Sequence, residues 1–414
     1  MNILNLPPEC ITLILLNISR LKIGIMCTVC NIFNKTIEDN VKLIKFRTLK
    51  APNMRHINDD ILYKLNFVKY INLNYRDCIT HKSLSKLTRL ESLILDENST
   101  INDISYLTNL TRLDLNRNRV ITNINKHTNL IYLDLSNNHK IIDISTLSNL
   151  KNLVLYNNNC ITDISNLTNL TCLDLGVNFT ITNDMLLTLT NITDLNLYNN
   201  HNITDVSYLI NLKKLNLNSN RMIRSLSMLT NLEYLDLTNN HMIISSDISH
   251  LTNIKNICLN KTITDLTKLN NLTELDISNN PYITYESISK LTNLTSIYLC
   301  NNDVDITKLT RLKNIGLIDD KFVTDEELSQ LTNLESLNII DNFLITGESI
   351  SKLINLKSLY LCKNTKITDD NIKQLTKLKT VKLSGNCSIT RNALDTLVNI
   401  KWIHNIKTIQ LNQY

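Results

Sequence analysis

The stretch LTNLTRLDLNRN, residues 107–118, decides the fold of this chain because its central phrase recurs along most of the 414 residues. Two leucines stand one residue apart, Leu113 and Leu115, and an asparagine follows three places later, Asn118. A phrase copied this often is either an artefact of composition or the repeating unit of the fold. Three further copies are LIYLDLSNN at 130–138, LEYLDLTNN at 232–240 and LTELDISNN at 272–280.

The copies keep a near-fixed period. We take as the anchor of each copy the apolar residue three places before the first leucine of the phrase. Most anchors recur at a spacing of about 20 or about 22, and two pairs are closer together, Ile254 with Leu272 and Leu294 with Leu312. Seventeen copies at this period exclude chance and predict a repeat protein. The anchors are Phe46, Val68, Leu90, Leu110, Leu130, Leu150, Leu170, Ile192, Leu212, Leu232, Ile254, Leu272, Leu294, Leu312, Leu334, Leu356 and Leu378.

Each full copy reads L-x-x-L-x-L-x-x-N, followed by isoleucine three places on and by a second apolar pair. The central L-x-L alternates with a period of two and predicts a short strand with one buried face. Asparagine both donates and accepts hydrogen bonds, so it can satisfy backbone groups where the chain turns inward. Asp163 and Asp205 each precede a short apolar stretch and predict a brief, capped helical turn. The two leucines therefore fill the core, and the asparagine closes the turn.

These features resemble the leucine-rich-repeat family, closest to its short-repeat, internalin-like type, over residues 46–400. The resemblance implies an α/β solenoid, the leucine-rich-repeat horseshoe, which is right-handed. A parallel β-sheet forms its concave face, and short helical turns or extended segments form its convex face. One unit cannot bury its own apolar residues, so stability comes from stacking. Thr262 and Asp320 take the asparagine position near the two short spacings, where we expect irregular curvature.

The chain before Phe46 follows a different pattern. Ile11, Ile14, Leu15 and Ile18 have helical spacing, and a second segment, 25–37, places apolar residues four apart on one face. The pattern predicts a small helical bundle that is too short to build a good core of its own. Such a bundle can cap the apolar end of the solenoid.

A sharper interpretation comes from the stretch LPPECITLILLNISRLKIGIMCTVCNIFN, residues 6–34, which resembles an F-box. It opens with Leu-Pro-x-Glu and has Val-Cys-Asn ahead of Phe33, and an F-box usually precedes leucine-rich repeats. The family usually has tryptophan in place of Phe33 and another near residues 43–44; both are missing, so the plain cap stays open. The resemblance implies that a Skp-type adaptor binds through Leu6, Pro7, Ile11, Ile14, Leu15, Val29 and Phe33.

The predicted organisation is an F-box-like helical domain at 1–45 and a leucine-rich-repeat domain at 46–414. The second has about 17 repeats, each of roughly 18–22 residues, and a C-terminal cap. Resemblance to F-box/leucine-rich-repeat proteins implies a non-catalytic substrate receptor of an SCF-type cullin–RING ubiquitin ligase, which holds an unidentified target protein. The alternative is a free-standing binding or decoy module. The amino-acid composition resembles that of proteins of large AT-rich DNA viruses. Because no secretion signal is evident, the ten cysteines are interpreted as free thiols in a reducing compartment. We therefore expect a location in the cytoplasm, the host's if viral, and a monomer outside the complex.

Composition and motifs argue against other classes. The net charge of +5, from 43 basic and 38 acidic residues, is too mild for a dedicated nucleic-acid surface. The N-terminus lacks a signal-peptide pattern, and its longest apolar run is too short to span a bilayer. The sequence contains no phosphate-binding glycine loop, no metal-ligand spacing and no placed Ser/His/Asp set. We therefore expect no enzymatic activity, no cofactor and no metal.

The outward strand positions, two, four and six places after each anchor, predict where a target binds. Asp114, Asp134 and Asp174 put an acidic stripe at the fourth place, although a solvated aspartate needs no partner. Tyrosine is enriched at binding hot spots, and at the sixth place two tyrosines flank a glycine. Strands lie about 4.8 Å apart, so the rings should stand about 10 Å apart and leave a slot for one apolar or cationic side chain. Chance placement of the fourteen tyrosines is the alternative. The predicted target-binding residues are Tyr132, Tyr156, Asp174, Gly176, Asn196, Tyr198 and Tyr234.

Overall fold

The computed structural model describes residues 48–49, 59, 62, 68–74, 79–278, 280–385, 388–395, 397 and 402–406. The chain divides into two compact units, Met1–Ile203 and Thr204–Tyr414. The predicted F-box-like domain at 1–45, with its boundary and its adaptor-binding residues, lies outside the described residues.

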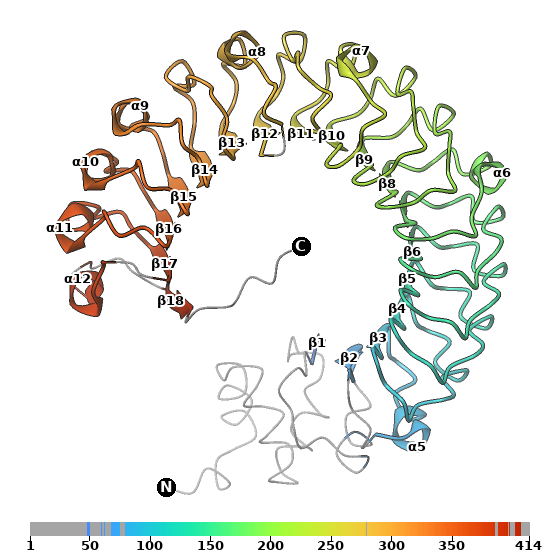
Figure 1. Cartoon of the computed structure of the whole chain (residues 1–414). Coiled ribbons are helices and arrows are strands. Elements are labelled where there is room, and N and C mark those ends of the chain that lie inside the picture. The colour runs from blue at the N-terminus through green and yellow to red at the C-terminus, as the bar shows by residue number, and fades with distance from the viewer. Residues whose placement is uncertain are drawn as a thin grey trace, which may run out of the picture. The chain divides into compact units, whose positions relative to one another are not determined.

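The first unit is built on a parallel sheet in which each strand pairs with the strand of the next repeat. Its elements are β1 (Thr48–Leu49), β2 (Tyr70–Asn72), α5 (His81–Leu84), β3 (Ser92–Ile94), β4 (Arg112–Asp114), β5 (Tyr132–Asp134), β6 (Asn152–Val154), β7 (Cys172–Asp174), α6 (Asn183–Leu186) and β8 (Asp194–Asn196). Leu113 of β4 lies opposite Leu133 of β5, so equivalent positions of successive repeats are neighbours. In Figure 1 the strands line one side of this unit, and α5 and α6 lie on the other.

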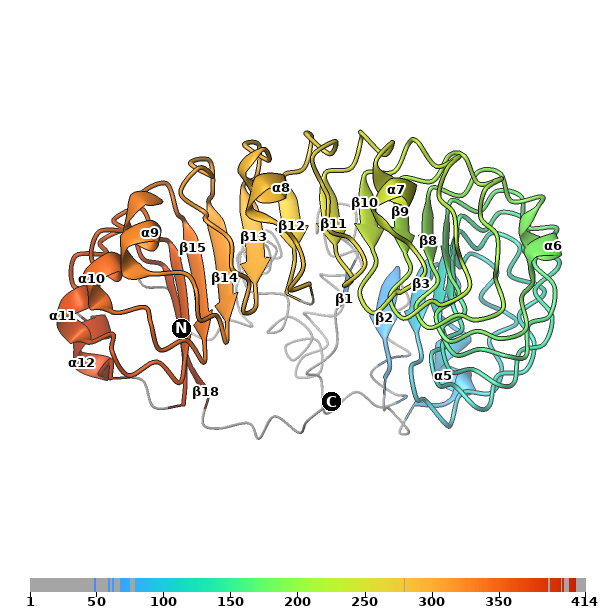
Figure 2. The same cartoon turned by 45° about the horizontal axis from the view of Figure 1, so that its top comes forward.

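The second unit has the same plan, with longer strands toward its C-terminal end. Its elements are β9 (Lys214–Asn216), β10 (Tyr234–Asp236), α7 (Ser245–Ile248), β11 (Asn256–Cys258), β12 (Glu274–Asp276), α8 (Tyr285–Ser289), β13 (Ser296–Leu299), β14 (Asn314–Ile318), α9 (Asp325–Gln330), β15 (Ser336–Ile340), α10 (Gly347–Ile350), β16 (Ser358–Cys362), α11 (Asp369–Ile372), β17 (Thr380–Ser384), α12 (Arg391–Asp395) and β18 (Trp402–Ile406). Figure 2 shows the broad faces of β13 to β15 beside one another. In both units the strands pair in parallel.

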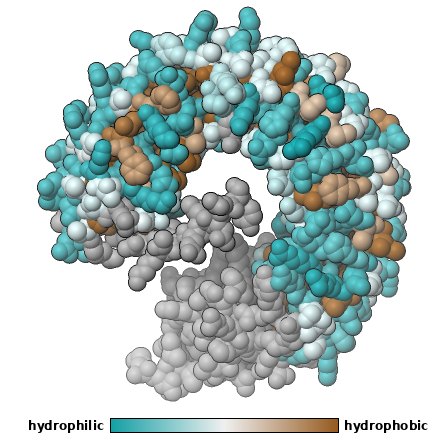
Figure 3. Space-filling model, in the orientation of Figure 1, coloured by the Kyte–Doolittle hydropathy of each residue, from teal (hydrophilic) through white to brown (hydrophobic). Residues whose placement is uncertain are grey.

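The strand leucines form the core, as the sequence predicts. Leu110, Leu113 and Leu115 are 0% exposed, whereas the residues on either side of Leu113 are half-buried. Full burial of a leucine side chain contributes about 2 kcal/mol, and here the buried contacts come from the repeats above and below. Hydrophilic residues predominate on the visible faces, with scattered apolar side chains between them (Figure 3). The predicted α/β solenoid of stacked repeats is confirmed.

Repeat length determines where helices form. In the described part of the chain, each helix lies in one of the longest repeats, as α9 does in the repeat that runs from Leu312 to the next anchor, Leu334. The additional length leaves room for a capped turn, in which Thr324 accepts from the backbone N–H of Glu327. In the shorter repeat from Leu150 to Leu170, Asp163 instead accepts from the N–H of Ser165 at 2.8 Å, and no helix follows. The helical turns predicted after Asp163 and Asp205 are therefore wrong, because an aspartate that binds the second following N–H closes a turn instead.

In most of the described repeats a buried asparagine ties the repeat to the preceding one. The Nδ2 of Asn138 donates to the carbonyl oxygens of Leu115 and Asn118 at 3.1 and 3.0 Å. Its Oδ1 accepts from the N–H groups of Lys140 and Ile141 at 3.0 and 3.1 Å. One 0% exposed side chain thus satisfies four backbone groups where no sheet ladder continues. We call this set the buried asparagine ladder; it comprises Asn98, Asn118, Asn138, Asn158, Asn178 and Asn200 in the first unit, and Asn220, Asn240, Asn260, Asn280, Asn302, Asn342 and Asn364 in the second.

The ladder position in one short repeat differs from the prediction. Asn260, rather than Thr262, is the ladder residue, because its Oδ1 accepts from the N–H groups of Thr262 and Ile263 at 2.8 and 3.2 Å. The repeat from Ile254 therefore lacks the pair of residues that usually separates the second strand leucine from the asparagine. The deletion leaves the ladder unbroken, since Asn280 donates to the carbonyl of Asn260 at 2.6 Å.

Asp320 does replace an asparagine, as predicted, and the structure gives the reason. Its carboxylate accepts from the N–H groups of Phe322 and Val323 at 3.1 and 2.9 Å, as an asparagine oxygen would. Its second oxygen accepts from the N–H of Asn302 at 3.3 Å. In the preceding short repeat the backbone N–H of Asn302 points toward this position, so a carboxylate oxygen suits the site where the side-chain NH2 of an asparagine would not.

A second row of asparagines, which the sequence analysis does not predict, lies on the surface one residue before the anchors. The Nδ2 of each donates to a carbonyl of the preceding repeat at 2.8–3.1 Å, as Asn129 does to Thr108. The recurrent Asn-Leu pairs therefore have a structural cause besides composition. We call this set the surface asparagine row; it comprises Asn109, Asn129, Asn149, Asn169 and Asn191 in the first unit, and Asn231, Asn253, Asn271, Asn293, Asn333 and Asn355 in the second.

Candidate functional site

The side of each sheet that faces away from the turns and helices, here the inner face, carries three rows of side chains. They stand two, four and six places after the anchors, as predicted, because the leucines between them point into the core. In β4 and β5 the outer residues of each strand are half-buried around a buried leucine. In the first unit these rows hold most of the predicted target-binding residues.

The acidic stripe in the middle row has a structural role. Asp134 accepts from the N–H of Ser136 at 2.8 Å, and Asp174 accepts from the N–H of Gly176 at 2.8 Å. Each carboxylate takes the N–H two residues on, which ends the strand with a side-chain turn. Asn196 serves the same purpose, and its Nδ2 also donates to Asp174 at 2.9 Å. Strand closure explains why Leu-Asp-Leu recurs, and it holds the carboxylates in place on the inner face.

The carboxylates of the first unit influence one another. Burial raises the pKa of Asp114 to about 6, the neighbouring carboxylates of Asp134 and Asp96 add to the rise, and the backbone hydrogen bond from Asn116 and the charge of Arg112 oppose it. Burial also raises the pKa of Asp174. The approach of an external cation stabilises the ionised form of these carboxylates, so this surface favours a cationic ligand.

One cation already lies on this surface. The guanidinium carbon of Arg112 stands 3.4 Å from the centroid of the Tyr132 ring. This contact is a cation–π interaction, and the carboxylates of Asp114 and Asp134 lie on the same strands. Tyr132 was predicted to flank the slot, but one face of its ring is covered by the side chain of Arg112. Arg112 itself was not predicted, although it stands in the row of Tyr132 one repeat earlier.

The predicted slot between Tyr156 and Tyr198 is closed. The two rings stack with centroids 6.4 Å apart and planes 17° apart, closer than the expected separation of about 10 Å. The glycine between them is the reason: a Cβ added to Gly176 would stand 2.8 Å from Cδ2 of Tyr156, so the ring leans over the glycine. The prediction of an open slot is wrong, and the surface presents a tyrosine pair beside Asp174 and Asn196.

Backbone strain lies next to this tyrosine pair. Val177 has a φ of 54°, a left-handed conformation that β-branched residues avoid. The equivalent position holds Asn137, Asn157 and Asn199, and asparagine adopts this conformation more readily. Gly176 and Val177 thus both depart from the residues that would stabilise the repeat best. Such local departures concentrate at functional sites.

The second unit has related features of its own. Tyr234 lies on β10, opposite Lys214 of β9 and Asn256 of β11. Another ring leans over a glycine there, because a Cβ on Gly316 would stand 2.6 Å from Cδ1 of Tyr298. The sequence could have indicated that a tyrosine ring lies over a glycine, because Gly316 takes the same repeat position as Tyr298, one repeat later.

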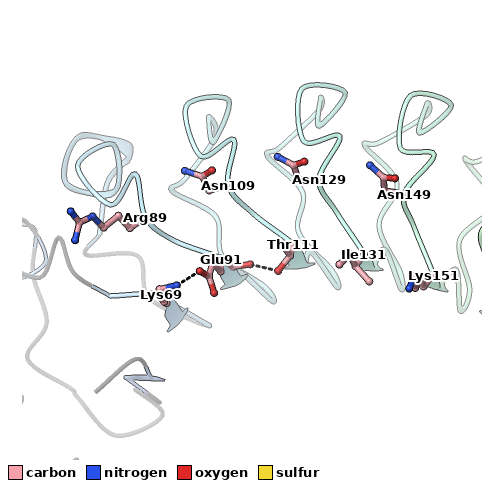
Figure 4. A pocket seen from close by; sticks show the side chains of 9 residues that line it. All are labelled: Lys69, Arg89, Glu91, Asn109, Thr111, Asn129, Ile131, Asn149 and Lys151. Carbon is pink, nitrogen blue, oxygen red and sulfur yellow. Dashed lines mark hydrogen bonds and ion pairs between the residues drawn. The ribbon is translucent and has the colours of Figure 1, made fainter. Parts of the chain in front are cut away.

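A groove runs along the flank of each unit, between the surface asparagine row and the residues that follow the anchors. Figure 4 shows the groove of the first unit, with Asn109, Asn129 and Asn149 on one wall and Glu91, Thr111, Ile131 and Lys151 on the other. Lys69 pairs with Glu91 there, and Arg89 also lines it. The groove of the second unit has a volume of about 630 Å³ and is lined by Thr295, Thr310, Arg311, Lys313, Asn333, Glu335, Asn355, Lys357 and Lys377.

Among the described residues, no group of three or more His, Cys, Asp or Glu side chains could hold a metal ion. None of the helices in the described ranges is long and apolar enough to cross a membrane.

No protein-family model matches this chain. No curated protein matches it either. Among solved structures, it is similar to an internalin from Listeria monocytogenes, with 26% identity, 77% of this chain and 87% of that chain covered, and a TM-score of 0.46. It is also similar to a leucine-rich-repeat protein of Leptospira interrogans, with 24% identity, 89% and 98% covered, and a TM-score of 0.48. A third similar structure is the Toll–Spätzle complex of Drosophila, with 18% identity, 80% and 53% covered, and a TM-score of 0.49.

Proposed function

We propose that this chain is a non-catalytic protein-binding solenoid, and that the inner face of its first unit holds a basic segment of a partner protein. The observation that carries the proposal is the arrangement around Gly176, where stacked tyrosines stand beside Asp174 on a strained repeat. The contact of Arg112 with Tyr132 supports the chemistry, because it places a guanidinium on an aromatic ring among carboxylates. An arginine or lysine of the partner would make equivalent contacts at the tyrosine pair.

The tyrosine pair is expected to contribute most to binding of a cationic segment. For the full chain and a labelled peptide of alternating arginine and glycine, the double variant Tyr156→Ala, Tyr198→Ala should weaken affinity about tenfold. The expected loss corresponds to about 1.4 kcal/mol of cation–π and stacking energy. Fluorescence anisotropy at low salt measures it. The double variant is a cleaner test than a bulky residue at Gly176, which would also collide with Tyr156.

A matched control removes two exposed tyrosines from another surface. Tyr282→Ala with Tyr285→Ala should leave the affinity unchanged, since these side chains are 62% and 44% exposed in the second unit. The pH profile gives an independent check: affinity should rise between pH 5 and 7 as the inner-face carboxylates ionise, because burial raises the pKa of Asp174 beside the pair and raises that of Asp114 to about 6. Equal losses in both double variants, or an affinity that is flat across this pH range, would contradict the proposal.

We further propose that the chain is the substrate receptor of an SCF-type cullin–RING ubiquitin ligase. The support is the Leu-Pro-x-Glu stretch that begins at Leu6 and its place ahead of the repeats. Under this proposal a Skp-type adaptor docks on the N-terminal segment, while the solenoid presents the target, in the cytoplasm. A free-standing binding module would use the same solenoid without an adaptor.

Adaptor binding separates these two functions. The intact chain should co-purify with a Skp-type adaptor, and Leu6→Ala with Pro7→Ala should reduce the bound fraction at least tenfold, because both residues belong to the Leu-Pro-x-Glu stretch on which the proposed adaptor binding rests. The control variant Leu187→Ala with Pro281→Ala changes the same residue types at exposed positions of the solenoid. Absence of adaptor from the purified intact chain would favour the free-standing module.

A further inference from the structure

The flank groove of the second unit has more positive charge than that of the first unit, which is lined by three cations and one carboxylate. Four cations line the groove of the second unit, Arg311, Lys313, Lys357 and Lys377, against the single carboxylate of Glu335. The side chains of Lys313 and Lys357 are 57% and 47% exposed, so their charges face solvent. We call this surface the basic groove.

Two of these cations stand where the repeat would otherwise place an asparagine. Positions one before the anchor hold asparagine from Asn109 to Asn355, except at Arg311, and Lys377 follows. Each asparagine there bonds a carbonyl of the preceding repeat, as Asn333 does to Thr310 at 3.0 Å. Arg311 and Lys377 donate instead to a side-chain oxygen of the preceding repeat, so the substitutions keep a bond between repeats and add a charge.

Neighbouring groups hold the four cations at the groove. Arg311 donates to Oδ1 of Asn293 at 2.8 Å, and Lys377 donates to Oδ1 of Asn355 at 2.6 Å. Glu335 pairs with Lys357 at 2.5 Å and with Lys313 at 3.5 Å, and these lysines lower its pKa. Cations that are already oriented lose less conformational freedom when an anion binds.

We propose that the basic groove binds an extended acidic segment of a partner protein, rich in Asp and Glu. The charge of the lining residues favours an anionic partner, and carboxylates pair with arginine and lysine through charge-assisted hydrogen bonds. The Asn and Thr side chains along both walls offer hydrogen bonds that suit a peptide backbone. No aromatic side chain of the described residues lines the groove, so single-stranded nucleic acid would find no stacking platform among them. The segment is distinct from the basic one proposed for the first unit.

The same chain supplies a matched control. Lys213 and Lys255 flank Glu233 in the same row, and Lys255 pairs with Glu233 at 2.6 Å. The positions before the nearby anchors hold Asn231 and Asn253 there, so this triad has no additional cations of the kind found in the basic groove. Replacing either pair of lysines removes the same charge and disrupts the same kind of ion pair.

The test uses the full chain and a labelled peptide of alternating glutamate and glycine. Lys313→Gln with Lys357→Gln should weaken its binding at least tenfold, whereas Lys213→Gln with Lys255→Gln should change it less than twofold. Binding should also fall steeply with added salt. Tyr156→Ala with Tyr198→Ala should not affect it, so failure on the first unit's inner face is distinguishable from failure here. Equal effects of the two lysine pairs, or tighter binding of an oligothymidylate than of the peptide, would overturn the inference.

Discussion

Asn138→Ala is expected to lower the free energy of unfolding by about 3 kcal/mol, because it leaves three backbone groups without partners at roughly 1 kcal/mol each. The carbonyl of Asn118 loses its donor, and the N–H groups of Lys140 and Ile141 lose their acceptor, whereas the carbonyl of Leu115 keeps the N–H of Asn118 at 3.0 Å. A 0% exposed position gives water little access to replace the amide. Urea unfolding followed by circular dichroism measures the change.

Asn149→Ala is the control in the adjoining turn. This exposed asparagine makes one bond between repeats, from Nδ2 to the carbonyl of Thr128 at 2.9 Å. Its loss should lower stability by about 0.5–1 kcal/mol, since water can bind the freed carbonyl. If the two variants were equally destabilised, the buried asparagine ladder would not have the role assigned to it.

Asp320→Asn is expected to destabilise the second unit by about 2 kcal/mol, although it restores the residue used at most ladder positions. Asp320 accepts from three N–H groups, those of Asn302, Phe322 and Val323. An asparagine whose oxygen kept the last two would turn its amide donors toward the N–H of Asn302. A buried N–H group would then lack an acceptor.

The neighbouring Asp319→Asn is the matched control, because it makes the same chemical change at an exposed position. Asparagine also tolerates the φ of 46° found at Asp319. Chemical denaturation of both variants gives the comparison. A gain in stability for Asp320→Asn would show that removal of a buried carboxylate outweighs the lost hydrogen bond.

The sequence predicts the repeat, the core and the strand faces because each depends on local periodicity. Leu113 and Leu115 are buried and Asn118 bonds the preceding repeat, as the opening stretch indicates. Helix placement also follows from spacing, in hindsight, because only the longest repeats have room for the capped turn. Local pattern suffices for these features, since neighbouring copies supply the tertiary contacts.

Features that depend on side-chain conformation could not be predicted in the same way. The distance between strands suggested an open slot beside Gly176, but the absent Cβ lets Tyr156 lean across it. The basic groove depends on Arg311 and Lys377, which matter only once the bonds of the surface asparagine row are known. The sequence shows that Arg311 and Lys377 replace asparagine, but it does not show the hydrogen bond that the asparagine makes to the preceding repeat.

The buried asparagine ladder also bears on how quickly the chain can fold. Asn138 reaches back only 20 residues to Asn118 and 23 residues to Leu115, and strand pairing likewise joins adjacent repeats. Parallel sheets usually require distant segments to meet, which makes them slow to form. Here each new strand closes a loop of one repeat, so the entropy of loop closure is small and nearly the same at every step. Folding can therefore begin wherever two neighbouring repeats meet and advance one repeat at a time, at a rate that further repeats do not reduce.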